Sequence, residues 1–247
     1  MKKILRKIHR WLGLLMALQL IAWMGSGLYF AWFPIETIRG EHLVSQDDVL
    51  PPGSLTDLQA PAFAAAQLTE HFGTSPRIER ATLTRRSGRV WYRLEGTQDQ
   101  GAFARLVDAE TGQVAGRLDR DGAIAIAMES LQVEGVVEEA RLVTEAEPGA
   151  EYRGRRLPLW RVAFDKPELL HVYIDPWTRD IVAQRTFRWR VFDFLWMLHI
   201  MDYGERDDFN TPLLQGAAVL GLLVALSGVI YWAQTTRLFR RRRRPIE

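Results

Sequence analysis

The sequence predicts a membrane protein in which two transmembrane helices flank an α+β region that lies outside the cytoplasm. Two apolar segments without a charged residue, one near each end of the chain, predict the helices. The distribution of charge predicts on which side of the membrane each part lies. A repeated order of one helix and several strands predicts that the region between the spans consists of two similar modules.

Each apolar segment is long enough to cross a lipid bilayer. Residues 11–33 and 213–233 contain no Asp, Glu, Lys or Arg over 23 and 21 positions. At a rise of about 1.5 Å per residue, either helix spans a hydrocarbon core about 30 Å thick. The sequence therefore predicts transmembrane helices at 11–33 and 212–233.

A cleavable signal peptide is the alternative for the first 33 residues. Signal peptides have a shorter apolar region, and small residues precede their cleavage site. Here the bulky side chains of YFAWFPIE (29–36) occupy the end of the apolar segment. The sequence favours an uncleaved signal anchor.

Basic residues are concentrated at both ends of the chain. Residues 1–10 contain five, and residues 234–247 contain six arginines against one acid. The totals of 32 basic and 30 acidic residues therefore leave 21 and 29 between the spans, a net charge of −8. The positive-inside rule then puts both termini in the cytoplasm and the central domain in the periplasm of a bacterial cell. The arginine tail is more typical of contact with anionic lipid than of nucleic-acid binding.

The central domain begins with a predicted module at 34–118. Residues 60–72, APAFAAAQLTEHF, predict a helix because they are rich in alanine and are followed by Gly73. Strands are predicted at 77–85, 89–96 and 103–118, the last interrupted by a turn at 110–112.

The same order repeats in a second predicted module at 119–187. A helix opened by Asp121 is predicted at 121–131, and strands follow at 139–147, 157–165 and 169–185. ARLVDAETGQVAGRL (104–118) aligns with HVYIDPWTRDIVAQR (171–185). The alignment places Asp108 opposite Asp175 and Thr111 opposite Thr178, which indicates an internal duplication.

Each of these two aspartates ends a strand and starts a tight turn. An aspartate side chain closes such a turn by accepting a hydrogen bond from the backbone two residues on. The alternative is a catalytic carboxylate pair, which requires the two modules to pack face to face. The sequence favours the turn role and predicts no catalytic residue.

Residues 188–204 are predicted to form an amphipathic helix at the membrane surface. One helical face carries Phe192, Trp196, His199 and Tyr203, and aromatic side chains of this kind are typical of the head-group region. The acids between 202 and 208 precede Asn210, Thr211 and Pro212, which predict the start of the second span. In an alternative interpretation His199, Asp202 and Glu205 bind a cation such as iron.

Together these features resemble the PepSY-associated transmembrane family. The matching residues are KIHRWLGLLMALQLIAWMGSGLYF (7–30), the VDAETGQV and IDPWTRDIV turns, and LWMLHIMDYG followed by TPLLQGAAVLGLLVALSGVIYW. The resemblance implies an inner-membrane protein whose two modules are PepSY-like repeats. Larger members have four or more spans and include ferric-siderophore reductases that carry haem on transmembrane histidines, whereas this chain has two spans.

The resemblance implies b-type haem, for which His9 and His199 are the candidate axial ligands. They flank opposite ends of a membrane-spanning segment of about 35 Å. Because both ligands of one iron lie within a few Å of it, one chain cannot use both histidines on one haem. A homodimer could pair each with its copy, and the small residues Gly13 and Gly221 lie on faces that allow close helix packing. The alternatives are an interfacial anchor for His9 and, for His199, a place on an amphipathic helix that lies on the outer leaflet with its aromatic side chains in the head-group region.

Several cofactor classes are excluded or not predicted. The chain has no cysteine, which excludes structural disulfides, cysteine-ligated iron–sulfur clusters and c-type haem. It also contains no phosphate loop or nucleotide fingerprint, so electrons for a reductase would come through haem from a membrane redox partner or a quinol. His42, His71 and His171 are predicted to have structural roles.

The leading hypothesis is an inner-membrane protein that binds b-type haem as a dimer or with a partner. It would pass electrons to a periplasmic acceptor linked to iron or siderophore uptake, as a ferric-siderophore reductase or a component of one. A cofactor-free module that binds a periplasmic protein is the first alternative. An accessory subunit of a larger membrane complex is the second.

Overall fold

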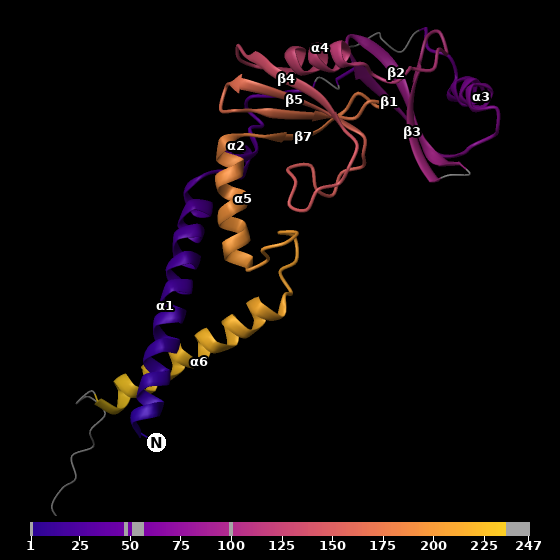
Figure 1. Cartoon of the computed structure of the whole chain (residues 1–247). Helices are drawn as coiled ribbons and strands as arrows, with labels where there is room; N and C mark the ends of the chain where they lie inside the picture. Colours follow the sequence, from indigo (N-terminus) through magenta and orange to yellow (C-terminus); the bar gives the residue numbers. More distant parts are fainter. Residues whose placement is uncertain (1, 47–48, 51–56, 99–100, 236–247) are drawn as a thin grey trace, which may run out of the picture. The chain divides into compact units, whose positions relative to one another are not determined.

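The computed structural model describes residues 2–46, 49–50, 57–98 and 101–235 (Figure 1). The chain divides into two compact units, a helical one of residues 1–34 and 191–247 and a larger one of residues 35–190.

The larger unit is an α+β fold with two antiparallel sheets. The first sheet has the order β1 (Arg77–Arg86), β2 (Arg89–Gln98), β3 (Gly101–Asp108). The second has the order β4 (Val136–Val143), β5 (Leu159–Lys166), β6 (His171–Ile174), β7 (Ile181–Arg185). The unit begins with the short helix α2 (Ile35–Arg39), and one helix precedes each sheet, α3 (Pro61–Phe72) and α4 (Arg120–Ser130). The predicted α+β class and the repeated order of helix and strands are confirmed.

Helix α3 covers one face of the first sheet. It starts at Pro61 and ends at Gly73, whose left-handed backbone (φ 71°) lets its N–H bond the carbonyls of Thr69 and Glu70. Along β2 every second side chain is directed to α3, so Val90, Tyr92 and Leu94 form a buried cluster with Ala64 and Leu68 of the helix. The alternation of apolar residues in β2 and the glycine after α3 therefore both agree with the structure of this module.

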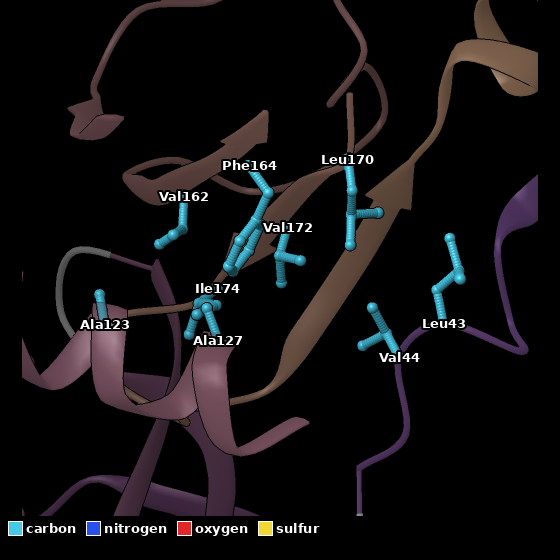
Figure 2. Packing of buried hydrophobic residues seen from close by; sticks show 9 residues of the cluster. All are labelled: Leu43, Val44, Ala123, Ala127, Val162, Phe164, Leu170, Val172 and Ile174. Carbon is cyan, nitrogen blue, oxygen red and sulfur yellow. The ribbon is translucent and has the colours of Figure 1, made fainter. Parts of the chain in front are cut away.

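Helix α4 covers the second sheet in an equivalent way. Figure 2 shows the small side chains of Ala123 and Ala127 against the large apolar side chains of β5 and β6, among them Phe164 and Ile174. The helix is capped by Asp119, whose Oδ1 accepts a hydrogen bond from the Gly122 N–H at 2.8 Å. The prediction that Asp121 opens this helix is wrong. Asp119 has the extended backbone of a capping residue, and Asp121 already lies in the first turn of the helix.

A hydrogen bond joins the first segment of the α+β unit to its last segment. The Thr186 hydroxyl donates to the Ile38 carbonyl at 3.0 Å and accepts from the Trp189 N–H at 3.1 Å. At Gly40 (φ 75°) a Cβ would lie 2.6 Å from the Thr186 methyl group, so a side chain is excluded there. Both ends of the unit are therefore fixed by one buried threonine.

The helical unit contains the two long apolar helices, α1 (Lys2–Trp32) and α6 (Pro212–Thr235). Each is long and apolar enough to cross a membrane, over residues 10–32 and 212–229. Their large side chains face outward, with Met24 74% and Leu222 61% exposed. The two helices approach each other where Met16, which is buried, lies against Gly221. Such an apolar outer surface is unlike the polar outer face of a helix in a water-soluble protein.

The segment before α6 starts that helix as predicted. Pro212 is its first residue, and the Thr211 hydroxyl accepts a hydrogen bond from the Leu214 N–H at 3.2 Å. The acids upstream mainly shape the loop, since the Asp202 carboxylate accepts the N–H groups of Gly204, Asp207 and Asp208.

Helix α5 (Phe187–Ile200) is shorter than the predicted helix 188–204. It ends at Ile200 because Met201 has a left-handed backbone (φ 54°). Tyr203 therefore lies outside the helix, and the predicted aromatic face keeps Phe192, Trp196 and His199.

Candidate functional site

Helix α5 lies antiparallel against α1 and brings His199 to the first apolar helix. The ring of Phe192 lies 4.8 Å from that of Phe30, and the His199 ring hydrogen-bonds Ser26. Leu198 lies beside a part of α1 that is nearer its N-terminus, since the Leu198 carbonyl is 3.5 Å from Gln19 Nε2. The aromatic face predicted to contact lipid head groups thus has protein side chains of α1 as neighbours.

The hydrogen bonds of Ser26 fit the tautomer of the His199 imidazole that carries its hydrogen on Nδ1. The buried Ser26 hydroxyl donates its single hydrogen to the Ala22 carbonyl at 2.7 Å, which is normal for a serine inside a helix. Its oxygen is then the acceptor for His199 Nδ1, 2.7 Å away. In the tautomer that matches this arrangement, the ring hydrogen is on Nδ1 and Nε2 keeps a lone pair.

Aromatic side chains fix the orientation of the same imidazole. Trp196 is stacked parallel to it at 6.5 Å between ring centroids, and Phe30 meets it edge-on at 5.5 Å. The indole N–H of Trp196 donates to the Arg206 carbonyl, and the Arg206 guanidinium donates to the buried Asp193 carboxylate at 2.5 Å. The loop after α5 is therefore tied back to the helix that carries His199.

The structure keeps the two predicted haem ligands apart. His9 belongs to α1, but its side chain lies outside the described residues. Ser26, the partner of His199, is 17 residues further along α1, which corresponds to about 26 Å. An iron site within one chain could therefore use His199 but not His9 as well.

The alternative cation site of His199, Asp202 and Glu205 is not formed. The Asp202 carboxylate accepts hydrogen bonds from three backbone N–H groups, and His199 Nδ1 is hydrogen-bonded to Ser26. Among the residues that the structure describes, no group of three or more histidine or acidic side chains could hold a metal ion.

Asp108 and Asp175 have the predicted turn roles. Asp108 Oδ1 accepts the N–H groups of Glu110 and Thr111 at 3.1 and 2.9 Å. Asp175 Oδ1 accepts those of Trp177 and Thr178 at 2.7 and 3.0 Å. Because each carboxylate closes its own turn, the geometry gives no support to a catalytic pair.

An ion cluster that the sequence analysis missed joins the two modules. Asp180, in the turn before β7, accepts hydrogen bonds from Arg86 and Arg93 of the first sheet, both at 2.5 Å. Arg86 and Asp180 are only 7% and 14% exposed. Next to them the Arg179 guanidinium lies over the Trp91 ring. These partners are 87 and 94 residues apart in sequence, and no local pattern connects them.

A second polar cluster surrounds Glu151. Its carboxylate bonds His171 Nδ1 at 2.7 Å, the Tyr173 hydroxyl at 2.9 Å and Arg190 Nε at 2.6 Å. Burial alone would raise the pKa of Glu151, but the hydrogen bonds and charges of His171 and Arg190 lower that pKa to about 2. Burial and the Glu151 charge raise the pKa of Tyr173 well above its usual value. The predicted structural role of His171 agrees with this geometry.

A groove of about 560 Å³ lies between the two modules, along β3. We call it the β3 groove. The first module lines it with residues of β2 and β3 and with Glu79 of β1. The second module lines it with the segment 154–158, the turn that starts at Asp175 and Val182 of β7. Arg105 lies over the Trp177 ring at 4.0 Å and thereby joins the two sides.

Comparison with known proteins gives little further information. No protein-family model and no curated protein matches the chain. Among solved structures it is similar to a "putative lipoprotein" from Clostridium difficile 630, at 16% identity over 54% of this chain and 97% of that chain. The TM-score is 0.22, so no functional conclusion is drawn from this likeness.

Proposed function

We propose that the chain is a bacterial inner-membrane protein of the PepSY-associated transmembrane type that binds b-type haem through His199. It does so as a homodimer or with a membrane redox partner, and it passes electrons to a periplasmic acceptor linked to iron or siderophore uptake. In this role it is a ferric-siderophore reductase or a component of one.

The exposed apolar surfaces of α1 and α6 support the membrane location. Over their described side chains both helices present large aliphatic groups outward, and burial in lipid removes that surface from water. The basic ends and the net charge of −8 between the spans favour cytoplasmic termini and a periplasmic α+β unit.

The hydrogen bond between His199 Nδ1 and Ser26 is the observation that carries the haem proposal. Histidines that ligate a metal through one ring nitrogen almost always donate the other N–H to a hydrogen-bond acceptor such as a carboxylate, a backbone carbonyl or water. Ser26 is such an acceptor, and the lone pair of Nε2 suits an axial ligand. When bound, haem supplies one-electron transfer, which no side chain of this chain provides.

A second histidine ligand would come from another chain. The helical unit contains only His9 and His199, and these are too far apart to share one iron. A Cβ added at Gly13 or Gly228 would meet nothing within 4 Å, so these positions leave room for a second helix. A two-fold dimer would bring two copies of His199 to the same site.

An absorption spectrum of the full-length protein in detergent tests the proposal. We expect a Soret band and a sharp α band on reduction, with most of the haem lost in His199→Ala. Ser26→Ala should weaken haem binding by about tenfold, because the ligand loses its orienting partner. The control is His42→Ala, which removes an exposed histidine of the α+β unit. A colourless protein, or an unchanged spectrum in His199→Ala, would contradict the proposal.

A cofactor-free binding module is the second candidate function. The β3 groove favours it, because the groove is lined by both modules and does not involve His199. The two functions are compatible, since the groove belongs to the α+β unit and the imidazole to the helical unit.

A further inference from the structure

The two modules differ at the edge of their third strand. In the second module β7 pairs with β6 along its whole length, from His171 opposite Arg185 to Ile174 opposite Ile181. In the first module the equivalent residues pair only with the end of β3, where Val114 bridges Val107 and the Ala115 N–H bonds the Leu106 carbonyl. The first sheet therefore has half of a fourth strand.

The uncovered half of β3 presents backbone groups to the β3 groove. The Ala115 bond shows that the backbone of Leu106 is directed away from β2, and the β2–β3 register is continuous. Because direction alternates along a strand, Ala102 and Ala104 also direct their N–H and C=O groups outward. Arg105 and Arg156 approach these two carbonyls, whereas neither N–H has a hydrogen-bond partner among the described residues. Both alanines line the groove.

Most charged side chains that line the groove have a partner of opposite charge or a turn role. The arginines of the segment 154–158 are different. Asp180 and Glu95 pair with Arg93, and Asp175 closes its turn. Glu79 is an exposed acid on β1. On the opposite side Arg155 and Arg156 are exposed, and within the described part of the chain neither pairs with a carboxylate.

Arg155 also lies close enough to Arg185, an arginine of β7 that does not line the groove, to repel it. Burial, followed by the charge of the neighbouring Arg155, lowers the pKa of Arg185 to about 10. A guanidinium repelled by another guanidinium gains from any anion placed nearby. An acidic ligand therefore has a favourable position beside residues 155 and 156.

We propose that the β3 groove binds an extended acidic segment of another protein, which pairs with Ala102 and Ala104 of β3 and completes the fourth strand of the first sheet. Backbone hydrogen bonds to the two alanines hold the segment, as in other complexes where a peptide extends a sheet edge. Its carboxylates contact Arg155 and Arg156, which select acidic sequences. The internal duplication supplies the template, because β7 occupies this place in the second module. The site is independent of haem binding.

Fluorescence anisotropy with labelled hexapeptides tests this proposal on the full-length protein in detergent. The probe alternates glutamate with valine, and two control peptides carry lysine in place of glutamate or N-methyl groups on alternate amides. We expect the acidic peptide to bind and both controls to bind at least about tenfold more weakly. No binding of the acidic peptide at about 1 mM, or equal binding of all three, would overturn the proposal.

Variants of the protein separate backbone pairing from charge. Arg155→Glu combined with Arg156→Glu should lower affinity for the acidic peptide at least about tenfold, whereas Arg141→Glu, exposed on β4 outside the groove, should leave it unchanged. Ala104→Pro removes an outward N–H and should also weaken binding, with Ala104→Ser as control. If the proline variant fails to fold, the N-methylated peptide tests the same hydrogen bonds from the ligand side. Unchanged affinity in both the charge-reversed protein and the N-methylated peptide would contradict strand pairing.

Discussion

At the scale of single residues, some polar side chains of the α+β unit that are largely removed from water have several partners. Glu151 is the clearest case, because one carboxylate connects its own segment to β6 through His171 and Tyr173 and to the start of α5 through Arg190. The charged form of Glu151 is stabilised only in the folded protein. Its contribution to stability therefore depends on pH.

We expect Glu151→Gln to destabilise the α+β unit by about 2 kcal/mol at pH 7. The folded pKa of about 2 lies below the unfolded value of 4.5, so the stabilisation is complete above 4.5 and is lost as the pH falls towards 2. Denaturant unfolding of both proteins at pH 7 and pH 3 measures the difference. A difference that does not shrink at pH 3 would show that the carboxylate charge is not the cause.

Asp180 represents the other kind of buried partner, a carboxylate that neutralises arginines of the neighbouring module. Asp180→Ala removes the carboxylate that neutralises the buried Arg86, and we expect a loss of about 3 kcal/mol in unfolding free energy. Asp121→Ala, which removes a carboxylate that is 91% exposed, is the matched control and should change stability by less than about 0.5 kcal/mol. Equal effects of the two substitutions would argue against docking of the modules through this cluster.

At the scale of elements, the two aspartate turns have the same pattern of hydrogen bonds in both modules. In both turns the aspartate accepts two N–H groups, and a threonine hydroxyl accepts a third from the residue two positions on. The turn residue with a left-handed backbone is Gly112 in one copy and Arg179 in the other. The arginine tolerates this conformation while its guanidinium packs on Trp91.

Asp108→Ala and Asp175→Ala should each lower the unfolding free energy by about 1 to 2 kcal/mol, because each leaves two N–H groups without their acceptor. Glu110→Ala, an exposed neighbour in the first turn, should be close to neutral. Thermal unfolding followed by circular dichroism compares the three variants. A much smaller effect at one aspartate than at the other would contradict the equivalence of the turns.

Local sequence signals predicted these elements, whereas the contacts between them were beyond prediction. Gly73 as a helix stop and the two aspartate turns depend on neighbours within a few residues, and the structure confirms them. The Asp180 cluster depends on how two modules dock. The Ser26–His199 bond joins residues 173 positions apart, and a helical face of aromatic residues predicts lipid and protein neighbours equally well.

At the scale of the whole molecule, the proposed function depends on the arrangement of the chain in the membrane. Both ends have to lie in the cytoplasm, with residues 35–190 on the other side, for α1 to span the bilayer and for His199 to lie near its periplasmic half. The basic ends and the acidic central unit favour this topology. The β3 groove would then meet periplasmic proteins.

Cysteine labelling of intact cells tests this topology most directly, because the chain has no cysteine of its own. Single cysteines are introduced as Gln113→Cys, an exposed position of the α+β unit, and as Lys3→Cys near the N-terminus. With a membrane-impermeant maleimide in cells with a permeabilised outer membrane, we expect residue 113 to be labelled before lysis and residue 3 only after it. Labelling of residue 3 before lysis, or of residue 113 only after lysis, would contradict the account.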